Sequence, residues 1–306
     1  MSKQTPGELL TEFGATKEFW VDINPHLHIT DEPFQGQNYD CDSQRLDIAT
    51  RQLEEDGYFK IESIVPNSMC EALVLGIENV VNCGLPAPFA LVYDEYWEVY
   101  SRLQNMLSHF VGADVGLVPD FWMWHIAKDA NMAGWGPHRD DEIEGRPVLR
   151  EDGKPLILTV WIPFSNATPL NSCMYLLPLS RDPSYPDKIE KNSLPEGALQ
   201  HVRALPATPG TILGWNQYVL HWGGSNSKWA NESRVSMAFY VQDISEMPFD
   251  LTVFDFERKV VLEDRLGVIG RMIWKYRKYG FDESVLSFAK SYSMLLTASE
   301  SINSNR

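Results

Sequence analysis

The sequence has few cysteines, a deficit of basic residues, and no long apolar run. Its four cysteines, Cys41, Cys70, Cys83 and Cys173, stand far apart, without the paired spacing of a zinc knuckle or a disulfide framework. Lysine and arginine number 26 against 42 acidic residues, and the net charge of −16 argues against a nucleic-acid or anionic membrane partner. No apolar stretch approaches the ~20 residues of a membrane span, and the N-terminus lacks the features of a signal peptide. We therefore expect a cytoplasmic protein that acts on a small molecule.

The composition is that of an ordinary globular chain. Of 306 residues, 44% are hydrophobic and 22% are charged, enough to bury a substantial core. Without repeats or low-complexity tracts, the simplest prediction is a single domain over residues 1–306. Its parts are a helical N-terminal part (about 1–115), a β core (about 116–245) and a helical C-terminal extension (about 246–306).

The pattern of apolar residues predicts the elements of these three parts. Three helices are expected in the N-terminal part, over 42–57, from a cap at Asn67 or Ser68 to Gly84, and over 94–112. The β core carries short aromatic and β-branched runs, the clearest being "DFWMWHIAK", "LILTVWIPF", "CMYLLPL", "GTILGW" and "SRVSMAFYVQ". Helices around a β core predict a mainly β fold, a barrel or double-sheet jelly roll buttressed by helices.

The segment "GPHRDD" contains two candidate metal ligands. On or next to a strand, residues two apart project to the same side, so His138 and Asp140 face together. A second histidine, His221, ends another aromatic strand before a Gly-Gly turn. Two imidazoles and one carboxylate on one face of a metal are the arrangement of non-haem Fe(II) oxygenases. The alternative is that His138 and Asp140 form a hydrogen-bonded pair on the surface, and that His221 is a core histidine whose hydrogen bonds are satisfied within the protein.

The strand "SRVSMAFYVQ" follows His221 and carries an arginine. Alternation puts Arg234, Ser236, Ala238 and Tyr240 on one face, and the plainly apolar residues on the other. An inward arginine binds a carboxylate with both arms of its planar fork. If Arg234 lies close to the three candidate ligands, it indicates that the site binds a dicarboxylate cosubstrate. The alternative is that Arg234 forms an ion pair on the surface.

Together these segments resemble the phytanoyl-CoA dioxygenase family of Fe(II)- and 2-oxoglutarate-dependent oxygenases. The resemblance covers about residues 46–242 and rests on the order of its pieces: "EDGYF", "GPHRDD", "LTVWIPF", "NSCMYLLPLSRD", "TPGTILGW", "HWGGSN" and the Arg-x-Ser strand. It implies a double-stranded β-helix, the cupin-like barrel. The sequence departs from the family pattern at Ser172 and Cys173, and at Arg181 and Asp182.

The resemblance also implies the roles of individual residues. His138, Asp140 and His221 would be the iron ligands and the catalytic residues. Arg234 would bind the distal carboxylate of 2-oxoglutarate, with Ser236 assisting and Trp161 lining the cosubstrate side. With O2, such a site would oxidise a substrate, most simply by hydroxylating an unactivated C–H bond, and would release succinate and CO2.

The substrate contacts are less well defined by the sequence. Candidates are Arg181 at the start of a long polar loop, Trp124 or His125 from opposite faces of one strand, and Arg146 in the insert after the ligand pair. The ten tryptophans and twelve tyrosines suggest an aromatic cavity for an amino acid, a natural product or a related polar metabolite.

Two other functions remain open at this stage. A cupin-type metalloenzyme that does not use 2-oxoglutarate would keep the three ligands and have no need of Arg234. A non-catalytic binding protein on an oxygenase scaffold is the second alternative. The sequence predicts no oligomeric state.

Overall fold

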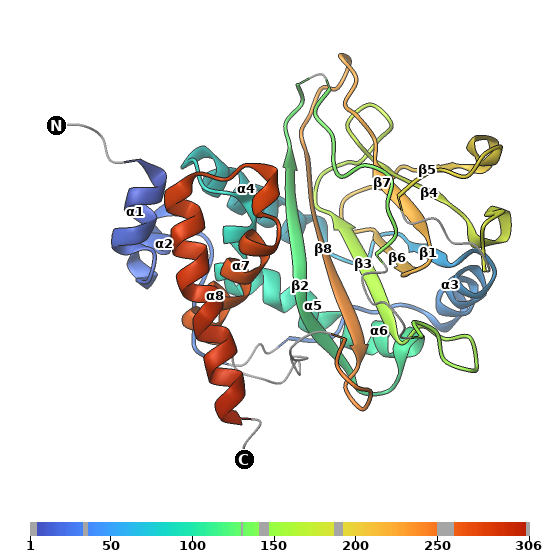
Figure 1. The fold of residues 1–306 in the computed structure, drawn as a ribbon, viewed down its shortest axis with the longest axis horizontal. Helices are drawn as coiled ribbons and strands as arrows, with labels where there is room; N and C mark the ends of the chain where they lie inside the picture. The colour runs from blue at the N-terminus through green and yellow to red at the C-terminus, as the bar shows by residue number, and fades with distance from the viewer. Residues whose placement is uncertain are drawn as a thin grey trace.

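Two antiparallel sheets face each other, and helices cover the outer side of the larger sheet (Figure 1). The computed structural model describes residues 5–32, 36–129, 131–140, 147–186, 192–249 and 260–303, with side chains as far as residue 294. The larger sheet has the order β1-β6-β3-β8-β2 and the smaller one β5-β4-β7. The strands are β1 (Tyr58–Ile61), β2 (Val115–Ile126), β3 (Ile157–Pro163), β4 (Met174–Leu177), β5 (Arg203–Leu205), β6 (Ile212–Asn216), β7 (Leu220–Gly223) and β8 (Arg234–Asp243). The predicted double-stranded β-helix with flanking helices is confirmed.

Helices occupy both ends of the chain. The α-helices are α1 (Pro6–Phe13), α2 (Lys17–Ile23), α3 (Ser43–Asp56), α4 (Asn67–Asn82), α5 (Asp94–Arg102), α6 (Gln104–Val111), α7 (Leu262–Lys275) and α8 (Glu283–Asn303). Short 3-10 turns are η1 (Ala87–Val92), η2 (Leu179–Arg181), η3 (Ala198–His201) and η4 (Arg277–Tyr279). No helix of the described residues is long and apolar enough to cross a membrane.

Two details of the predicted helices were wrong, and two helices were not predicted. The expected helix over 94–112 is broken at Leu103 into α5 and α6. The expected cap at Asn67 or Ser68 is absent, because α4 already begins at Asn67 and its N-cap residue is Pro66, which has no side-chain hydroxyl or amide. The sequence analysis did not predict α1 and α2, whose short lengths of 8 and 7 residues give little periodic signal.

A side-chain cap begins α3, and a glycine ends it just before β1. The side chain of Asp42 accepts a hydrogen bond from the Arg45 amide at 2.9 Å and caps the start of α3. Gly57 ends the helix with φ +80°, a left-handed conformation that glycine adopts without steric cost. The chain then enters β1, which pairs with β6 at the edge of the large sheet.

The large sheet separates two apolar layers, and β8 shows how the sequence divides them. Val235, Met237 and Phe239 point to the helical side and belong to the main core. Arg234 and Tyr240 lie on the opposite face and line a pocket. Alternation along this strand therefore places the polar residues between the two sheets, as predicted.

The C-terminal extension covers the edge of the large sheet formed by β2 (Figure 1). The buried Arg265 of α7 ties it to the N-terminal helices, since its guanidinium donates to the carbonyl of Val92 at 2.7 Å and to Asp94 at 2.6 Å. The last residues of α7 and the turn that follows consequently reach the rim of the pocket.

Candidate active site

Three side chains with metal-ligand chemistry meet between the sheets. Ligand atoms of His138, Asp140 and His221 all lie within 4.8 Å of one another. The backbones of the two histidines form an isolated antiparallel bridge, with N···O distances of 3.0 and 2.9 Å. The bridge explains why "GPHRDD" presents its ligands correctly: the loop pairs with β7 directly opposite His221.

Hydrogen bonds to the backbone determine which ring nitrogen of each histidine faces Asp140. His138 Nδ1 lies 2.8 Å from the carbonyl oxygen of Gly136, and His221 Nδ1 lies 3.0 Å from that of Val219. Because a carbonyl oxygen only accepts, each Nδ1 carries the proton and each Nε2 keeps its lone pair. The two Nε2 atoms stand 3.5 and 3.6 Å from Asp140 Oδ1. Such backbone partners are typical of histidines that bind metals.

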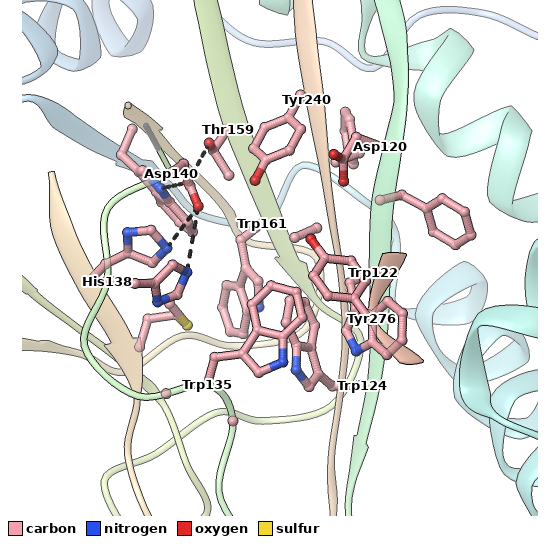
Figure 2. Close-up of a pocket in the computed structure, with 18 of the residues that line it drawn as sticks. Asp120, Trp122, Trp124, Trp135, His138, Asp140, Thr159, Trp161, Tyr240 and Tyr276 are labelled. Atoms are coloured by element: carbon pink, nitrogen blue, oxygen red, sulfur yellow. Dashed lines mark hydrogen bonds and ion pairs between the residues drawn. The ribbon is translucent and has the colours of Figure 1, made fainter. Parts of the chain in front are cut away.

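Asp140 is held through its other oxygen. Oδ2 accepts hydrogen bonds from Thr159 Oγ1 at 2.8 Å and from Trp215 Nε1 at 2.9 Å. Gln217 in turn donates to Thr159 Oγ1 at 2.9 Å, so the hydroxyl is oriented toward the carboxylate. Figure 2 shows the contacts of the Asp140 carboxylate as dashed lines. Oδ1 is thereby directed to the histidines.

The protonation states also suit a cation. Burial lowers the pKa of His221 to about 4 despite the nearby Asp140, so this imidazole is neutral at pH 7. Burial would raise the pKa of Asp140, but the interactions with His221, His138 and Thr159 outweigh it and hold the pKa well below its usual range. One carboxylate and two imidazoles are the ligand set of a divalent first-row metal.

Arg234 lies in the same pocket and is almost completely buried, with 1% of its surface exposed. Its guanidinium donates to Ser236 Oγ at 2.6 Å and to Ser172 Oγ at 3.4 Å. Trp124 and Trp161 flank it, each with its ring centre 5.6 Å from the guanidinium carbon. Burial lowers the pKa of Arg234 to about 9, which still leaves the group charged at pH 7.

This buried cation has no acidic partner among the described residues. Its Nε atom is buried without a hydrogen-bond acceptor there, and the same holds for Trp161 Nε1. An uncompensated buried charge is costly, so the arrangement suits an anionic ligand that completes it. Gly134 allows the close approach of the neighbouring loop, because a Cβ at this position would stand 3.1 Å from Arg234 Nη2.

The pocket that joins these groups has an empty volume of about 510 Å³, part of it open to solvent. Its walls are largely aromatic (Figure 2). The lining residues are Asp120, Phe121, Trp122, Trp124, Gly134, Trp135, His138, Asp140, Thr159, Trp161, Met174, Trp215, His221, Gly223, Arg234, Ala238, Phe239, Tyr240 and Tyr276.

Of the residues predicted to contact the substrate, only some line the pocket. Trp124 lines the pocket, and His125, on the other face of β2, does not. Arg181 is exposed at the end of η2 and is likewise not among the lining residues. Arg146 lies outside the described residues. Ser236 does not line the pocket but contacts it through its hydrogen bond with Arg234.

The departures from the family pattern have local explanations. Ser172 adopts φ +70°, in the left-handed region that favours glycine, and its hydroxyl oxygen lies 3.4 Å from Arg234 Nη2. Asp182 pairs with Arg139 at 2.6 Å, and both side chains are fully buried. Arg139 therefore points away from the ligand pair, as strand alternation predicts.

Several pocket residues were not predicted from the sequence, among them Thr159, Trp215, Asp120 and Tyr276. Thr159 lies two residues from Trp161 on β3 and therefore on the same face, and Trp215 is opposite Thr159 on β6, so strand alternation could have placed both toward the pocket. Asp120 and Tyr276 had no such signal, since they line the same pocket only through the packing of α7 on β2.

The comparisons with known proteins agree with this geometry. Residues 87–229 match the model of the family described as Phytanoyl-CoA dioxygenase (PhyH). No curated protein sequence matches the chain. A similar solved structure is the non-haem, α-ketoglutarate-dependent epimerase SnoN from nogalamycin biosynthesis, at a TM-score of 0.53 and 15% identity over 66% of this chain and 82% of that one.

Two further structures share the fold. HygX from Streptomyces hygroscopicus, solved with nickel and 2-oxoglutarate, has a TM-score of 0.50 and 16% identity over 69% of this chain and 90% of that one. EctD from S. alaskensis has a TM-score of 0.50 and 14% identity, over 74% and 90%.

The fold and the three candidate metal ligands together define a non-haem iron oxygenase with an intact triad of two histidines and one aspartate. Residues 87–229, which contain His138, Asp140 and His221, are similar to the phytanoyl-CoA dioxygenase family of Fe(II)- and 2-oxoglutarate-dependent oxygenases, a family that uses iron and 2-oxoglutarate and acts on small molecules.

Proposed function

We propose that this protein is a cytoplasmic, single-domain oxygenase that binds Fe(II), 2-oxoglutarate and O2 and hydroxylates an unactivated C–H bond of a small polar metabolite, amino acid or natural product. The observation that carries the proposal is the buried Arg234, which has no acidic partner in the described chain and lines the same pocket as His138, Asp140 and His221. Succinate and CO2 would be the products of the cosubstrate.

The position of Arg234 favours this reaction over the cupin-type alternative. A metal site without 2-oxoglutarate has no use for a buried guanidinium that costs free energy and has no counter-ion. HygX, which shares the fold, was solved with 2-oxoglutarate bound, which supports the same interpretation.

The chain's own residues have definable parts in such a reaction. His138 Nε2, His221 Nε2 and Asp140 Oδ1 would hold the metal from one side, and Thr159 and Trp215 keep the carboxylate in place. Arg234 would bind the distal carboxylate of 2-oxoglutarate with both arms of its fork. When bound, iron with 2-oxoglutarate and O2 supplies the oxidising equivalents that C–H hydroxylation requires.

The aromatic walls would place the substrate and exclude water. Trp124 and Trp161 shield the Arg234 guanidinium, which strengthens its attraction for a carboxylate because fewer waters compete. Trp122, Trp135 and Tyr276 close the other side and would hold a substrate carbon near the metal.

An anaerobic titration tests the proposal. The metal-free protein receives Fe(II) and then 2-oxoglutarate, and we expect a weak visible charge-transfer band that saturates. Iron binding without the band would favour the cupin-type alternative, and failure to bind iron would refute the ligand assignment. Substrate candidates are then screened by succinate release.

A further inference from the structure

The charged side chains that line the pocket within the described residues are Asp140, Arg234 and Asp120. Asp140 and Arg234 belong to the metal and cosubstrate end. Asp120 stands on the other side of the pocket, next to Tyr240 and across from His138 (Figure 2). It is 6% exposed and is used by no step described so far.

A local irregularity of β2 places Asp120 there. The pairing of β2 with β8 passes from Val118 opposite Tyr240 to Phe121 opposite Phe239, so Pro119 and Asp120 are extra residues on β2. Such bulges redirect side chains and are frequent beside active sites.

Helix α7 holds this bulge through two basic residues. Arg271 donates to the carbonyl oxygen of Pro119 at 3.0 Å, and Lys275 Nζ lies 2.7 Å from Asp120 Oδ2. The carboxylate is thus built into the pocket wall by the C-terminal extension.

Aromatic rings surround the same end of the pocket. The centres of the Trp122 and Tyr276 rings are 4.8 Å apart, and the Trp135 ring lies tilted with its centre 4.6 Å from that of Tyr276. Tyr240 reaches in from β8 on the side of Asp120 (Figure 2). Aromatic faces attract cations through their quadrupole, and a desolvated ring is worth more than an exposed one.

We propose that the Asp120 end of the pocket recognises a cationic alkylammonium group of the substrate. The inference rests on the proposed function, since it names the class of substrate that the same site accepts. A buried carboxylate among aromatic rings attracts a positive charge and repels an anion. A substrate whose polar group is a carboxylate or phosphate would face the Asp120 carboxylate here, and the described residues that line the pocket include no lysine or arginine besides Arg234.

Lys275 shows that this position accepts an alkylammonium group. Its Nζ contacts Asp120 and lies 5.4 Å from the centre of the Tyr276 ring, although Lys275 does not line the pocket. A purely structural ion pair between α7 and β2 is the competing explanation. The net charge of −16 adds a long-range attraction for cations.

The test compares choline with its neutral carbon isostere, 3,3-dimethylbutan-1-ol. Under argon, the full-length protein is titrated with each compound by tryptophan fluorescence, once metal-free and once with Fe(II) and 2-oxoglutarate. We expect choline to bind at least about tenfold more tightly than the isostere in both states. Equal affinities in both states would overturn the proposal, and this comparison requires no variant.

Two variants separate recognition from a structural role. Asp120→Asn should lower the affinity for choline about tenfold and leave that for the isostere unchanged, whereas Lys275→Met should raise the affinity for choline severalfold by removing the competing ammonium. Asp114→Asn, the same change at an exposed residue just before β2, is the matched control. Thermal melting monitors folding.

An unchanged preference for choline in a folded Asp120→Asn protein would contradict the proposal. Because the metal-free titration needs neither iron nor 2-oxoglutarate, its result is independent of the charge-transfer band. Choline selectivity without the band would contradict the oxygenase proposal alone, and the band without selectivity would contradict the substrate class alone.

Discussion

The two ends of the pocket carry opposite charges and are built in different ways. At one end, Arg234 and the strand β8 that bears it form a cationic site from residues close in sequence, Arg234 and Ser236. At the other end, Asp120 pairs with Lys275 and lines the pocket together with Tyr276, two residues that lie more than 150 residues away along the chain.

This difference separates what the reaction requires from what the substrate requires. The Arg234 end would serve a cosubstrate that is the same throughout the family, and strand alternation sets which face of β8 bears Arg234 and Ser236. The Asp120 end depends on a bulge in β2 and on helix α7, which lies beyond residues 87–229, the range that matches the family. Recognition of the substrate would therefore depend partly on an element outside the matched range.

The largest expected effect is the loss of the metal ligand that lies between the two ends. Asp140→Ala should lower the affinity for Fe(II) at least about 100-fold, since changes of outer partners alone cost 10- to 100-fold. Iron content after anaerobic loading is the measurement, with circular dichroism to check folding. The control is Asp141→Ala, at a neighbouring residue outside the described range that the sequence pattern predicts to point away from the ligands. Wild-type iron content in Asp140→Ala would refute the assignment.

Arg234→Gln should affect the cosubstrate end alone. Leaving the carboxylate of 2-oxoglutarate without its charged partner should weaken binding about 100-fold, from the 2–5 kcal/mol typical of a broken buried charge pair. Iron content should stay at the wild-type level, and the charge-transfer titration gives the affinity. Arg203→Gln, at a partly exposed arginine that pairs with Asp56, is the control. An unchanged requirement for 2-oxoglutarate would show that Arg234 is not the anchor.

Thr159→Val removes the hydrogen bond to Asp140 Oδ2 while keeping the shape of the side chain. We expect the affinity for Fe(II) to fall about tenfold, because the carboxylate is less firmly oriented. Competition with a chelator measures the change. If affinity is fully retained, the Trp215 hydrogen bond alone is sufficient to hold the carboxylate.

The smallest expected effect is at the Asp120 end. Tyr276→Leu deletes one aromatic face and should weaken choline binding about two- to fivefold, in line with roughly 0.5–1 kcal/mol for one cation–π contact. The charge-transfer band with 2-oxoglutarate should not change, which would sharpen the contrast between the two ends. Tyr279→Leu, at a residue outside the pocket lining, is the comparison variant.

Much of the fold followed from periodicity in the sequence. The five clearest of the predicted strands coincide with β2, β3, β4, β6 and β8, because each alternates apolar and polar residues or is a continuous apolar run. The short β5, of three residues, is too brief for such a pattern. Likewise, the break at Leu103 between α5 and α6 is not marked by glycine or proline, so the apolar spacing alone predicted one helix.

For the pocket, the sequence by itself determined the residues that alternation on one strand brings to one face. His138 with Asp140, and Arg234 with Tyr240, are of this kind, since a period of two is a property of the extended backbone. Only the tertiary structure decided that Asp120 pairs with Lys275 and lines one pocket with Tyr276, and that Thr159 and Trp215 hold Asp140. These meetings depend on which elements pack together, and long-range packing is set by the shape of whole surfaces and leaves no local pattern in the chain.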